Sequence, residues 1–190
     1  MIKQIKILGE KRIFDGFFKI DEGKIEERKS ESIISTFSRC KVTRPNAVAV
    51  LIYNEDSNKV ILVKQFRFPV AHYGSEFILE AVAGKIDGTE EPKDAAVREV
   101  FEEVGYKINK ESLSKPIEIY PSPGYSTEKI YIFLVVVKDA DKVEGAGGGL
   151  EEEDESIDIV ELELHDFIAK IKANEIMDSK TIIAANLIRI

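Results

Sequence analysis

The first 43 residues alternate polar and apolar side chains over short runs, for example at residues 12–20 and 32–37. This alternation is typical of strands that bury one face. Gly16 and Gly23 are the expected turns. The pattern predicts two or three antiparallel strands. Because so few strands have too little core to fold alone, we expect them to pack on the rest of the chain or on a second subunit.

The apolar runs become longer after residue 46. Two of them lie on either side of the polar turn at 54–58 and predict a hairpin. A further strand is predicted at 77–83, and it leads directly into Gly84. Later strands are expected near residues 117–120, at 130–138 and at 157–164.

Helical spacing of apolar residues appears in three places. One helix opens at Pro92, whose fixed φ suits a first turn, and ends before Gly105, a natural C-cap. Two more are predicted at 164–176 and 180–190. Strands interleaved with helices indicate a mixed α/β fold built in layers. No internal repeat or long linker interrupts the pattern.

The helix after Pro92 combines an apolar stripe with a cluster of acids. At about 100° per residue, Glu99, Glu102 and Glu103 are expected to project away from the stripe, with the first and last one turn apart. Like charges at that spacing weaken a helix by roughly 0.2–0.5 kcal/mol. The cluster therefore suggests a bound cation such as Mg²⁺ or Mn²⁺, since both prefer oxygen ligands. The alternative is a solvated acidic face. The stripe consists of Ala96, Val97, Val100, Phe101 and Val104.

Composition narrows the class of protein. With 190 residues, 44% of them hydrophobic, the chain can build one good core and a small accessory element. A net charge of −8 argues against nucleic acid as a partner. The single cysteine, Cys40, excludes an internal disulfide and is expected to be a buried structural residue. No segment has the length of a membrane span or of a signal-peptide core, so we expect a cytoplasmic protein without a membrane partner.

Residues 84–106 fit the pattern Gly-x5-Glu-x7-Arg-Glu-U-x-Glu-Glu-x-Gly-U, in which U is a bulky aliphatic residue. Eight matches of this kind arise by chance at roughly one position in 10⁹. Only Tyr106, at a packing position, departs from it. The segment resembles the Nudix box, and the chain is identified as a member of the Nudix hydrolases. The matching residues are Gly84, Glu90, Arg98, Glu99, Val100, Glu102, Glu103 and Gly105.

The resemblance implies a fold and a division of the chain. The expected fold is the Nudix α/β/α sandwich with a mixed sheet. Residues 1–43 become an N-terminal antiparallel β extension that serves dimerisation, and residues 44–190 the Nudix hydrolase domain. A homodimer is therefore expected.

The resemblance also implies a metal site in the box. Glu99, Glu103 and the backbone carbonyl of Ala83 are the implied ligands of Mg²⁺, for which Mn²⁺ can substitute. Glu102 is implied to support a second ion, and Arg98 to orient a catalytic glutamate through a salt bridge. Divalent ions on a diphosphate neutralise the transferring phosphoryl group and activate the attacking water.

Two later segments resemble the nucleotide-sugar branch of the family. Residues 122–128, SPGYSTE, resemble a loop of the ADP-ribose pyrophosphatase group in which Glu128 reaches the substrate; an ordinary tight turn is the alternative. Residues 147–164 and 173–181 resemble the GDP-mannose pyrophosphatase group. There Glu153 is implied to bind a metal and help activate water, and Glu152 to contact substrate. Any of the three glutamates from 151 to 153 can be the base, and a disordered acidic loop is the alternative.

Further substrate contacts are implied by the same resemblance, residue by residue. Arg67 is implied to contact the diphosphate or sugar, and Lys180 the substrate, although a surface lysine at a helix start fits equally. Phe17 can stack on a base or belong to a strand core. Arg39 is implied to reach the substrate from the N-terminal sheet, across a dimer interface. Gly84 and Lys85, at the start of the box, complete the substrate-binding candidates.

The implied reaction cuts a nucleoside diphosphate sugar into a nucleoside monophosphate and a sugar phosphate. GDP-mannose is favoured over ADP-ribose because of the C-terminal motif. Alternatives are a non-catalytic module that binds ADP-ribose as a sensor, another Nudix substrate such as UDP-glucose, or an enzyme that removes oxidised nucleoside triphosphates.

Overall fold

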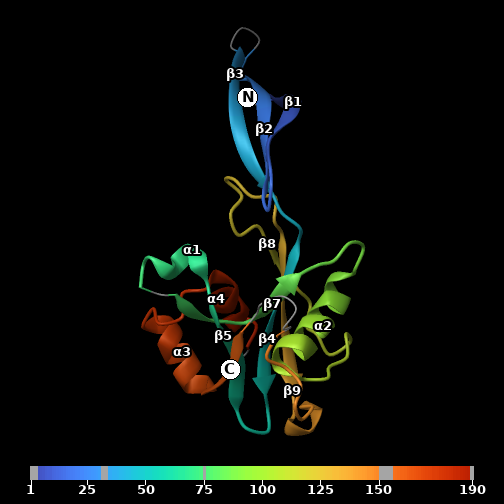
Figure 1. Ribbon diagram of the computed structural model, residues 1–190, viewed down its shortest axis with the longest axis vertical. Coiled ribbons are helices and arrows are strands. Elements are labelled where there is room, and N and C mark those ends of the chain that lie inside the picture. The colour runs from blue at the N-terminus through green and yellow to red at the C-terminus, as the bar shows by residue number, and fades with distance from the viewer. Residues whose placement is uncertain (1–3, 31–33, 75, 150–155, 189–190) are drawn as a thin grey trace. The chain divides into compact units, whose positions relative to one another are not determined.

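A computed structural model of the protein describes residues 4–30, 34–74, 76–149 and 156–188 (Figure 1). The chain forms two compact units, which are considered separately. The first comprises Met1–Asn46 and Tyr120–Lys129, and the second Ala47–Ile119 and Ile130–Ile190. No helix in the described ranges is long and apolar enough to span a bilayer.

The first unit is built on a three-stranded antiparallel sheet in the order β1-β2-β3. Gly16 lies in the turn between the first two strands, as predicted. The prediction for Gly23 was wrong, because this glycine lies inside β2 and is paired with Glu10 and Arg39. A lone glycine can continue a strand, and nothing in the alternation distinguishes that case from a turn. The strands are β1 (Gln4–Asp15), β2 (Lys19–Arg28) and β3 (Ile34–Thr43).

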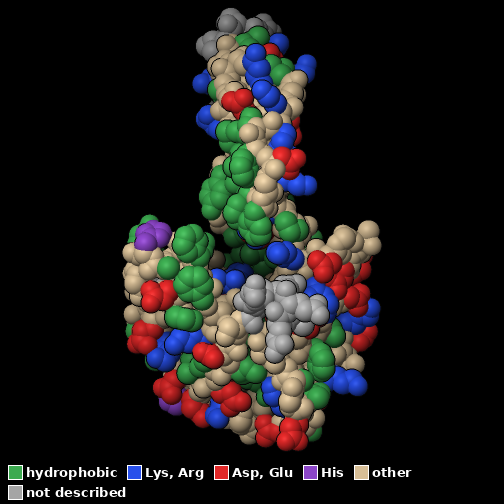
Figure 2. Space-filling view, viewed as in Figure 1, with side chains coloured by type: hydrophobic (Ala, Val, Ile, Leu, Met, Phe, Trp, Pro, Cys, Tyr) green, Lys and Arg blue, Asp and Glu red, His purple; other side chains and the backbone are tan. Residues whose placement is uncertain are grey.

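This sheet leaves many of its apolar side chains exposed. Figure 2 shows hydrophobic side chains at the surface of the first unit among lysines and arginines. Phe17, at the β1–β2 turn, is 89% exposed. Within the described residues, its one aromatic contact is an edge-to-face contact with Phe18. Cys40 is also exposed, so the expectation that it is buried was wrong. A single layer of strands has two open faces, and alternation does not say whether either is covered. The large exposed side chains of the strands are Ile5, Ile7, Leu8, Ile13, Phe14 and Ile34.

The SPGYSTE loop belongs to this unit. It begins as a tight turn in which the amide of Ser126 donates to the carbonyl of Ser122 at 2.9 Å. It then runs beside the end of β3. The amide of Val42 donates to the Tyr125 carbonyl at 2.6 Å, and the amide of Thr127 donates back to Val42 at 3.1 Å. The loop is thus tied to the N-terminal strands by backbone hydrogen bonds.

The second unit contains a mixed sheet in the order β10-β5-β4-β9-β8. β4 and β9 are parallel, whereas the other pairs are antiparallel. The predicted hairpin turn at 54–58 joins β4 to β5, and the later strands lie within two residues of their predicted ranges. The strands are β4 (Ala47–Asn54), β5 (Lys59–Phe66), β6 (Phe77–Glu80), β7 (Val82–Lys85), β8 (Ile117–Ile119), β9 (Ile130–Val137) and β10 (Ile157–Glu163).

The hairpin of β4 and β5 opens away from its turn. The two strands pair only from Ile52 to Asn54 on the β4 side. Farther along, β6 pairs with β5 and β7 pairs with β4. The chain from Phe77 to Lys85 therefore changes its pairing partner at Ala81, which is completely buried. This junction lies two residues before Ala83.

Helices cover both faces of the mixed sheet. α2 lies on one face, and α3 and α4 lie on the other (Figure 1). The two buried clusters confirm this, because one contains α2 residues such as Val100, while the other contains Phe167 of α3 and Ala184 of α4. The α/β/α sandwich is thus confirmed. The helices are α1 (Phe68–Ala71), α2 (Pro92–Val104), α3 (Leu164–Lys172) and α4 (Ser179–Ala185).

The helix ends obey local signals. Pro92 opens α2, and Gly105 closes it with a φ of 67°, both as predicted. α3 was predicted to extend to 176, but it ends at Lys172, and Asn174 two residues later has a φ of 58°. α4 also ends before its predicted boundary. The four-residue α1 is too short to show a helical period, so the sequence pattern missed it.

α2 differs from its predicted helical wheel at two positions. Phe101 was expected in the apolar stripe but is 43% exposed. Glu103 was expected on the opposite side but is only 3% exposed. Glu103 lies three residues after Val100 and seven after Ala96, so it shares their buried face. The prediction treated the three acids as one outward cluster, although at 100° per residue Glu103 lies only 60° from Val100.

Candidate functional site

β7 brings the start of the predicted box against α2. A Cβ atom at Gly84 would collide with the carboxylate of Glu99. Only glycine therefore allows this carboxylate to lie directly on the backbone after Ala83. The Glu99 side chain is itself largely buried at 12% exposure. Two of the predicted ligands, Glu99 and the Ala83 carbonyl, thus belong to neighbouring parts of one site.

Arg98 links the carboxylates of α2 and the loop before it. Its guanidinium donates to Glu90 at 3.1 and 3.2 Å, to Glu99 at 2.8 Å and to Glu102 at 3.0 Å. It also donates to the backbone carbonyl of Lys85 at 3.0 Å. One cation thus faces three carboxylates, and the cluster has an excess of negative charge. The salt bridge that the resemblance implies for Arg98 is present.

The pair of Arg98 and Glu90 is firmly ionised. Hydrogen bonding to Glu90, together with the charge of Glu99, raises the pKa of Arg98 above its ordinary value despite partial burial. The Arg98 guanidinium in turn lowers the pKa of Glu90. Both groups therefore keep their charges at neutral pH, which leaves Glu90 suited to holding Arg98 rather than to proton transfer.

The acidic side chains of α2 are of the chemical type that binds a hard divalent cation. Glu99, Glu102 and Glu103 supply carboxylate oxygens, and Gly84 leaves room for one of them beside the backbone. Across the described ranges, no three acidic, histidine or cysteine side chains already surround a common point. Arg98 holds two of these carboxylates, and Glu103 is buried. The chemistry of the donors therefore fits a hard divalent ion.

A second cluster of charges joins two predicted substrate contacts. Arg67, at the end of β5, donates to Glu80 at 2.7 and 3.3 Å. Lys180, in the first turn of α4, donates to the same carboxylate at 3.0 Å and to Asp178 at 2.6 Å. Glu80 is therefore shared by two cations that lie 113 positions apart in the chain. The four charges balance.

Burial differs between the two cations. The Arg67 side chain is 37% exposed, whereas that of Lys180 is 16% exposed. Burial lowers the pKa of Lys180, but the charges of Asp178 and Glu80 outweigh it and raise the pKa above its ordinary value. The interpretation of Lys180 as a free surface lysine is therefore wrong. Arg67 is the more accessible of the two for an incoming anion.

Glu80 and Asp178 were not among the predicted site residues. Glu80 interrupts the apolar run FILEAVA, and a lone acid in a strand predicted to be buried is a signal of a paired charge. Asp178 precedes Thr181 by three residues, the spacing of a helix N-cap, and its carboxylate accepts from the Thr181 amide. Neither signal shows that Lys180 donates to both acids, although it lies 100 positions from Glu80.

Three predicted substrate contacts belong to the first unit. Phe17 is exposed, which excludes the alternative that it lies in a strand core. Arg39 donates to the carbonyl of Ser38 at 3.0 Å and stacks on the Phe37 ring. Glu128 forms a 3.3 Å ion pair with Arg44. The roles of Phe17, Arg39 and Glu128 in binding stay predictions.

The glycine stretch before the acidic run is tied to the end of α2. The amides of Gly148 and Gly149 donate to the carbonyls of Glu103 and Glu102 at 2.8 and 3.2 Å. Gly147, Gly148 and Gly149 have φ values of 97°, 101° and 84°, which favour glycine. Through these two backbone hydrogen bonds the glycine stretch caps the end of α2. Residues 151–153, including the predicted Glu152 and Glu153, lie outside the described residues.

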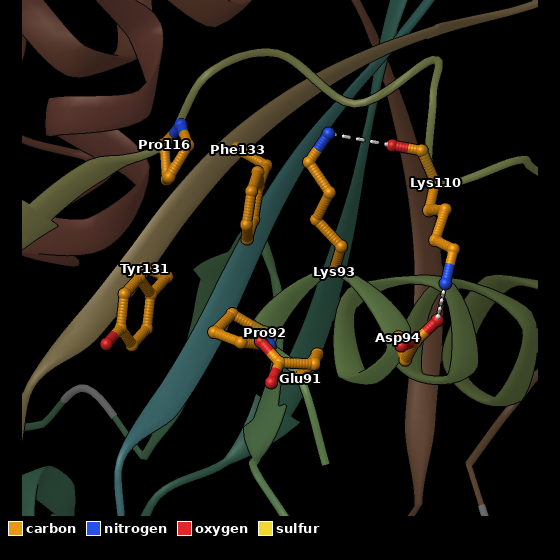
Figure 3. A pocket seen from close by; sticks show the side chains of 8 residues that line it. All are labelled: Glu91, Pro92, Lys93, Asp94, Lys110, Pro116, Tyr131 and Phe133. Carbon is orange, nitrogen blue, oxygen red and sulfur yellow. Dashed lines mark hydrogen bonds and ion pairs between the residues drawn. The ribbon is translucent and has the colours of Figure 1, made fainter.

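A cavity of about 340 Å³ lies elsewhere on the second unit (Figure 3). It is lined by the first turn of α2 and by Tyr131 and Phe133 of β9. Lys93 and Lys110 border it, and Lys110 is paired with Asp94 at 2.9 Å. None of the predicted site residues lines this cavity, so it is separate from the carboxylates of the box.

Comparison with known proteins agrees with this geometry. The NUDIX domain model matches residues 43–181. A protein named GDP-mannose pyrophosphatase from Citrobacter koseri is 32% identical over 188 residues, covering 98% of this chain and 95% of the relative. A protein of the same name from Escherichia coli strain SMS-3-5 is 31% identical, covering 100% of this chain and 97% of the relative.

A solved structure supports the fold. The crystal structure of an ADP compounds hydrolase matches with a TM-score of 0.71, covering 97% of this chain and 91% of that chain. At 22% sequence identity, this likeness concerns the fold alone. The family model covers the mixed sheet and the acidic helix, and the relatives extend along almost the whole chain. The protein therefore belongs to the Nudix hydrolase family.

Proposed function

We propose that this Nudix hydrolase cleaves the pyrophosphate bond of a nucleoside diphosphate sugar in a metal-dependent reaction. The products are a nucleoside monophosphate and a sugar phosphate, and GDP-mannose is favoured over ADP-ribose. The contact of Glu99 with the Gly84 backbone carries the proposal, because it builds the metal-binding turn of the box. Similarity to proteins named GDP-mannose pyrophosphatase along nearly the whole chain supports the substrate.

In this proposal the Ala83 carbonyl, Glu99 and Glu103 hold Mg²⁺ together with Glu153. A bound divalent ion neutralises the diphosphate and lowers the pKa of the attacking water. Arg98 holds Glu99 and Glu102 in place until the ion arrives. Because Arg98 stays charged, it prevents these carboxylates from repelling one another in the free protein. The general base is one of the glutamates from 151 to 153.

The proposed substrate contacts follow the family resemblance, residue by residue. Arg67 has the exposure and the fork-shaped donor set that suit a phosphate oxygen pair. Lys180 already donates to two carboxylates, so it can offer the substrate its third N–H. Phe17 offers an exposed ring for stacking on a base. The remaining proposed contacts are Arg39, Gly84, Lys85, Glu128 and Glu152.

We also propose a cytoplasmic homodimer that associates through the first unit. The exposed apolar side chains of β1, among them Phe14, and the exposed Phe17 support this, since an uncovered sheet face favours association. Sedimentation at micromolar protein concentration measures whether the protein is a dimer or a monomer. A monomer would contradict this part of the proposal and the contact of Arg39 across a dimer interface, but not the metal-dependent cleavage itself.

The substrate is tested by incubating the protein with GDP-mannose, ADP-ribose and UDP-glucose in the presence of Mg²⁺. Phosphatase treatment then releases orthophosphate from the monophosphate products, and intact nucleotide sugars serve as blanks. We expect turnover that is fastest with GDP-mannose and that disappears with EDTA. If no nucleotide sugar is cleaved, the proposal is wrong, and binding of ADP-ribose without turnover would favour a sensor module instead.

A further inference from the structure

The strand that leads to the metal-binding turn changes its pairing partner at Ala81. Glu80 ends the segment that pairs with β5, and Val82 begins the segment that pairs with β4. Ala81 is completely buried in the cluster that contains α3 and α4. Its amide lies outside both strand ladders. A buried amide needs another acceptor, since leaving one unsatisfied costs free energy.

Thr181 of α4 provides that acceptor. The Ala81 amide donates to Thr181 Oγ at 2.7 Å, across 100 positions of the chain. The hydroxyl in turn donates to Asp178 Oδ2 at 2.6 Å. Because its hydrogen is committed to a carboxylate, the lone pair of the hydroxyl is directed at the Ala81 amide. Thr181 is completely buried, so water does not compete for these bonds.

Asp178 is fixed by several contacts of its own. It caps α4 by accepting from the Thr181 amide at 2.9 Å, and its second oxygen accepts from Lys180 at 2.6 Å. Lys180 also donates to Glu80, the neighbour of Ala81, at 3.0 Å. α4 therefore binds the strand at two consecutive residues: Lys180 contacts the side chain of Glu80, and Thr181 contacts the backbone of Ala81.

We propose that Thr181 and Asp178 are positioning residues for the metal site. They hold the junction at Ala81, and from there β7 carries the carbonyl of Ala83 and the Gly84 backbone to Glu99. This inference rests on the proposed function only in that the Ala83 carbonyl serves as a metal ligand. A shift of the junction moves that carbonyl, while the carboxylates on α2 keep their places on the other face of the sheet.

Thr181→Val separates the hydrogen bond from the packing, because valine has the same shape but no hydroxyl. Thr181→Ser restores the hydroxyl. Ser114→Ala is a matched control, because Ser114 Oγ accepts from the strand amide of Leu134 at 3.0 Å without a link to the box. All variants are the full chain, compared at a temperature at which circular dichroism shows each to be folded.

Two measurements compare the variants with the wild type. Titration with Mn²⁺ monitored by electron paramagnetic resonance gives the metal affinity, and amide exchange monitored by NMR reports on Ala81. We expect Thr181→Val to weaken Mn²⁺ binding about tenfold, at the lower end of losses for residues that orient metal ligands. We also expect faster exchange of Ala81, and recovery of turnover with excess Mn²⁺. Thr181→Ser and Ser114→Ala should bind Mn²⁺ within about twofold of the wild type.

Equal Mn²⁺ affinity of Thr181→Val and the wild type would overturn the inference, as would an equal loss in Ser114→Ala. If Thr181→Val does not fold, Asp178→Asn decides by the same criterion, since it weakens the orientation of the hydroxyl and keeps the shape. A wild-type protein that binds no Mn²⁺ would also overturn it. A protein that binds Mn²⁺ but cleaves no nucleotide sugar would overturn only the proposed function.

Discussion

The two units build their strands from different patterns and differ in how far those strands are covered. In the second unit, β4 is buried along nearly all its length and helices cover both faces of the sheet. In the first unit, β1 interleaves polar and apolar side chains instead of forming one apolar run, and it is exposed at every position. Alternation therefore indicates that a strand has an apolar face, but not that this face is covered. The second unit contains buried charged side chains such as Glu80 and Glu103, whereas the first unit exposes most of its side chains to solvent.

The largest expected effect tests whether the chemistry belongs to the second unit. Glu103→Gln removes a proposed metal ligand and keeps the shape of the side chain. We expect kcat for GDP-mannose to fall by about 10³-fold, because a metal contributes several kcal/mol to the barrier. Thermal denaturation should show an intact fold. The control is Glu161→Gln, which removes only an exposed ion pair with Lys59. Retained activity would mean that the box does not hold the metal.

Two phenylalanines compare the packing of the units directly. Phe167 of α3 is completely buried, whereas Phe14 of β1 is 54% exposed. We expect Phe167→Ala to lower the free energy of unfolding by about 3–5 kcal/mol, and Phe14→Ala by less than about 0.5 kcal/mol in a monomer. Urea denaturation monitored by circular dichroism measures both. A large loss for Phe14→Ala would show that its face is covered in solution, as a homodimer requires.

Gly147→Ala tests the cap that the glycine stretch forms on α2. A Cβ atom there would lie 2.8 Å from the carbonyl carbon of Val104, and the φ of 97° is unfavourable for alanine. We expect a loss of about 1–3 kcal/mol in the free energy of unfolding and weaker activity. Gly145→Ala is the control, because it also has a positive φ of 76° but open space around it. Equal losses in the two variants would attribute the effect to backbone conformation alone.

The smallest expected effect is a loss of stability of the first unit at acidic pH. A hydrogen bond from Arg12, and then one from Thr43, lowers the pKa of Asp21. Because the folded pKa lies below the unfolded value of about 3.9, the stabilisation is present above that value and is lost as the pH falls through the folded pKa. We expect the protection factors of amides in β1 and β2, which compare exchange with the intrinsic rate at the same pH, to fall below about pH 4, again near the reference value. Asp21→Asn should show the faster exchange at pH 7 already, and unchanged exchange in this variant would contradict the role of the carboxylate.

Much of the mixed sheet was predictable because its signals are local. The polar turn at 54–58, Pro92 at a helix start and Gly105 at its end each depend on a few neighbouring residues. The predictions of a turn at Gly23 and of a buried Cys40 were wrong because neither property is set by neighbouring residues. Both depend on what lies across the strand, and nothing near them in the sequence reports it.

The candidate site divides in the same way. The box places Arg98, Glu99, Glu102 and Glu103 on one helix, so their proximity is a consequence of the helical repeat. The burial of Glu103 is also a consequence of that repeat, once its angle relative to Val100 is considered. By contrast, the sharing of Glu80 between Arg67 and Lys180 joins three separate elements. No local pattern predicts such a contact.

By itself, the sequence determined the family, the acidic helix and the order of strands and helices, because each depends on residues close together in the chain. Only the tertiary structure decided how the strand from Phe77 to Lys85 enters the open hairpin and changes partner at Ala81. It also decided that α4 holds that junction through Thr181. The physical reason is that a buried amide must find an acceptor wherever the fold brings one, and here that acceptor lies 100 positions away.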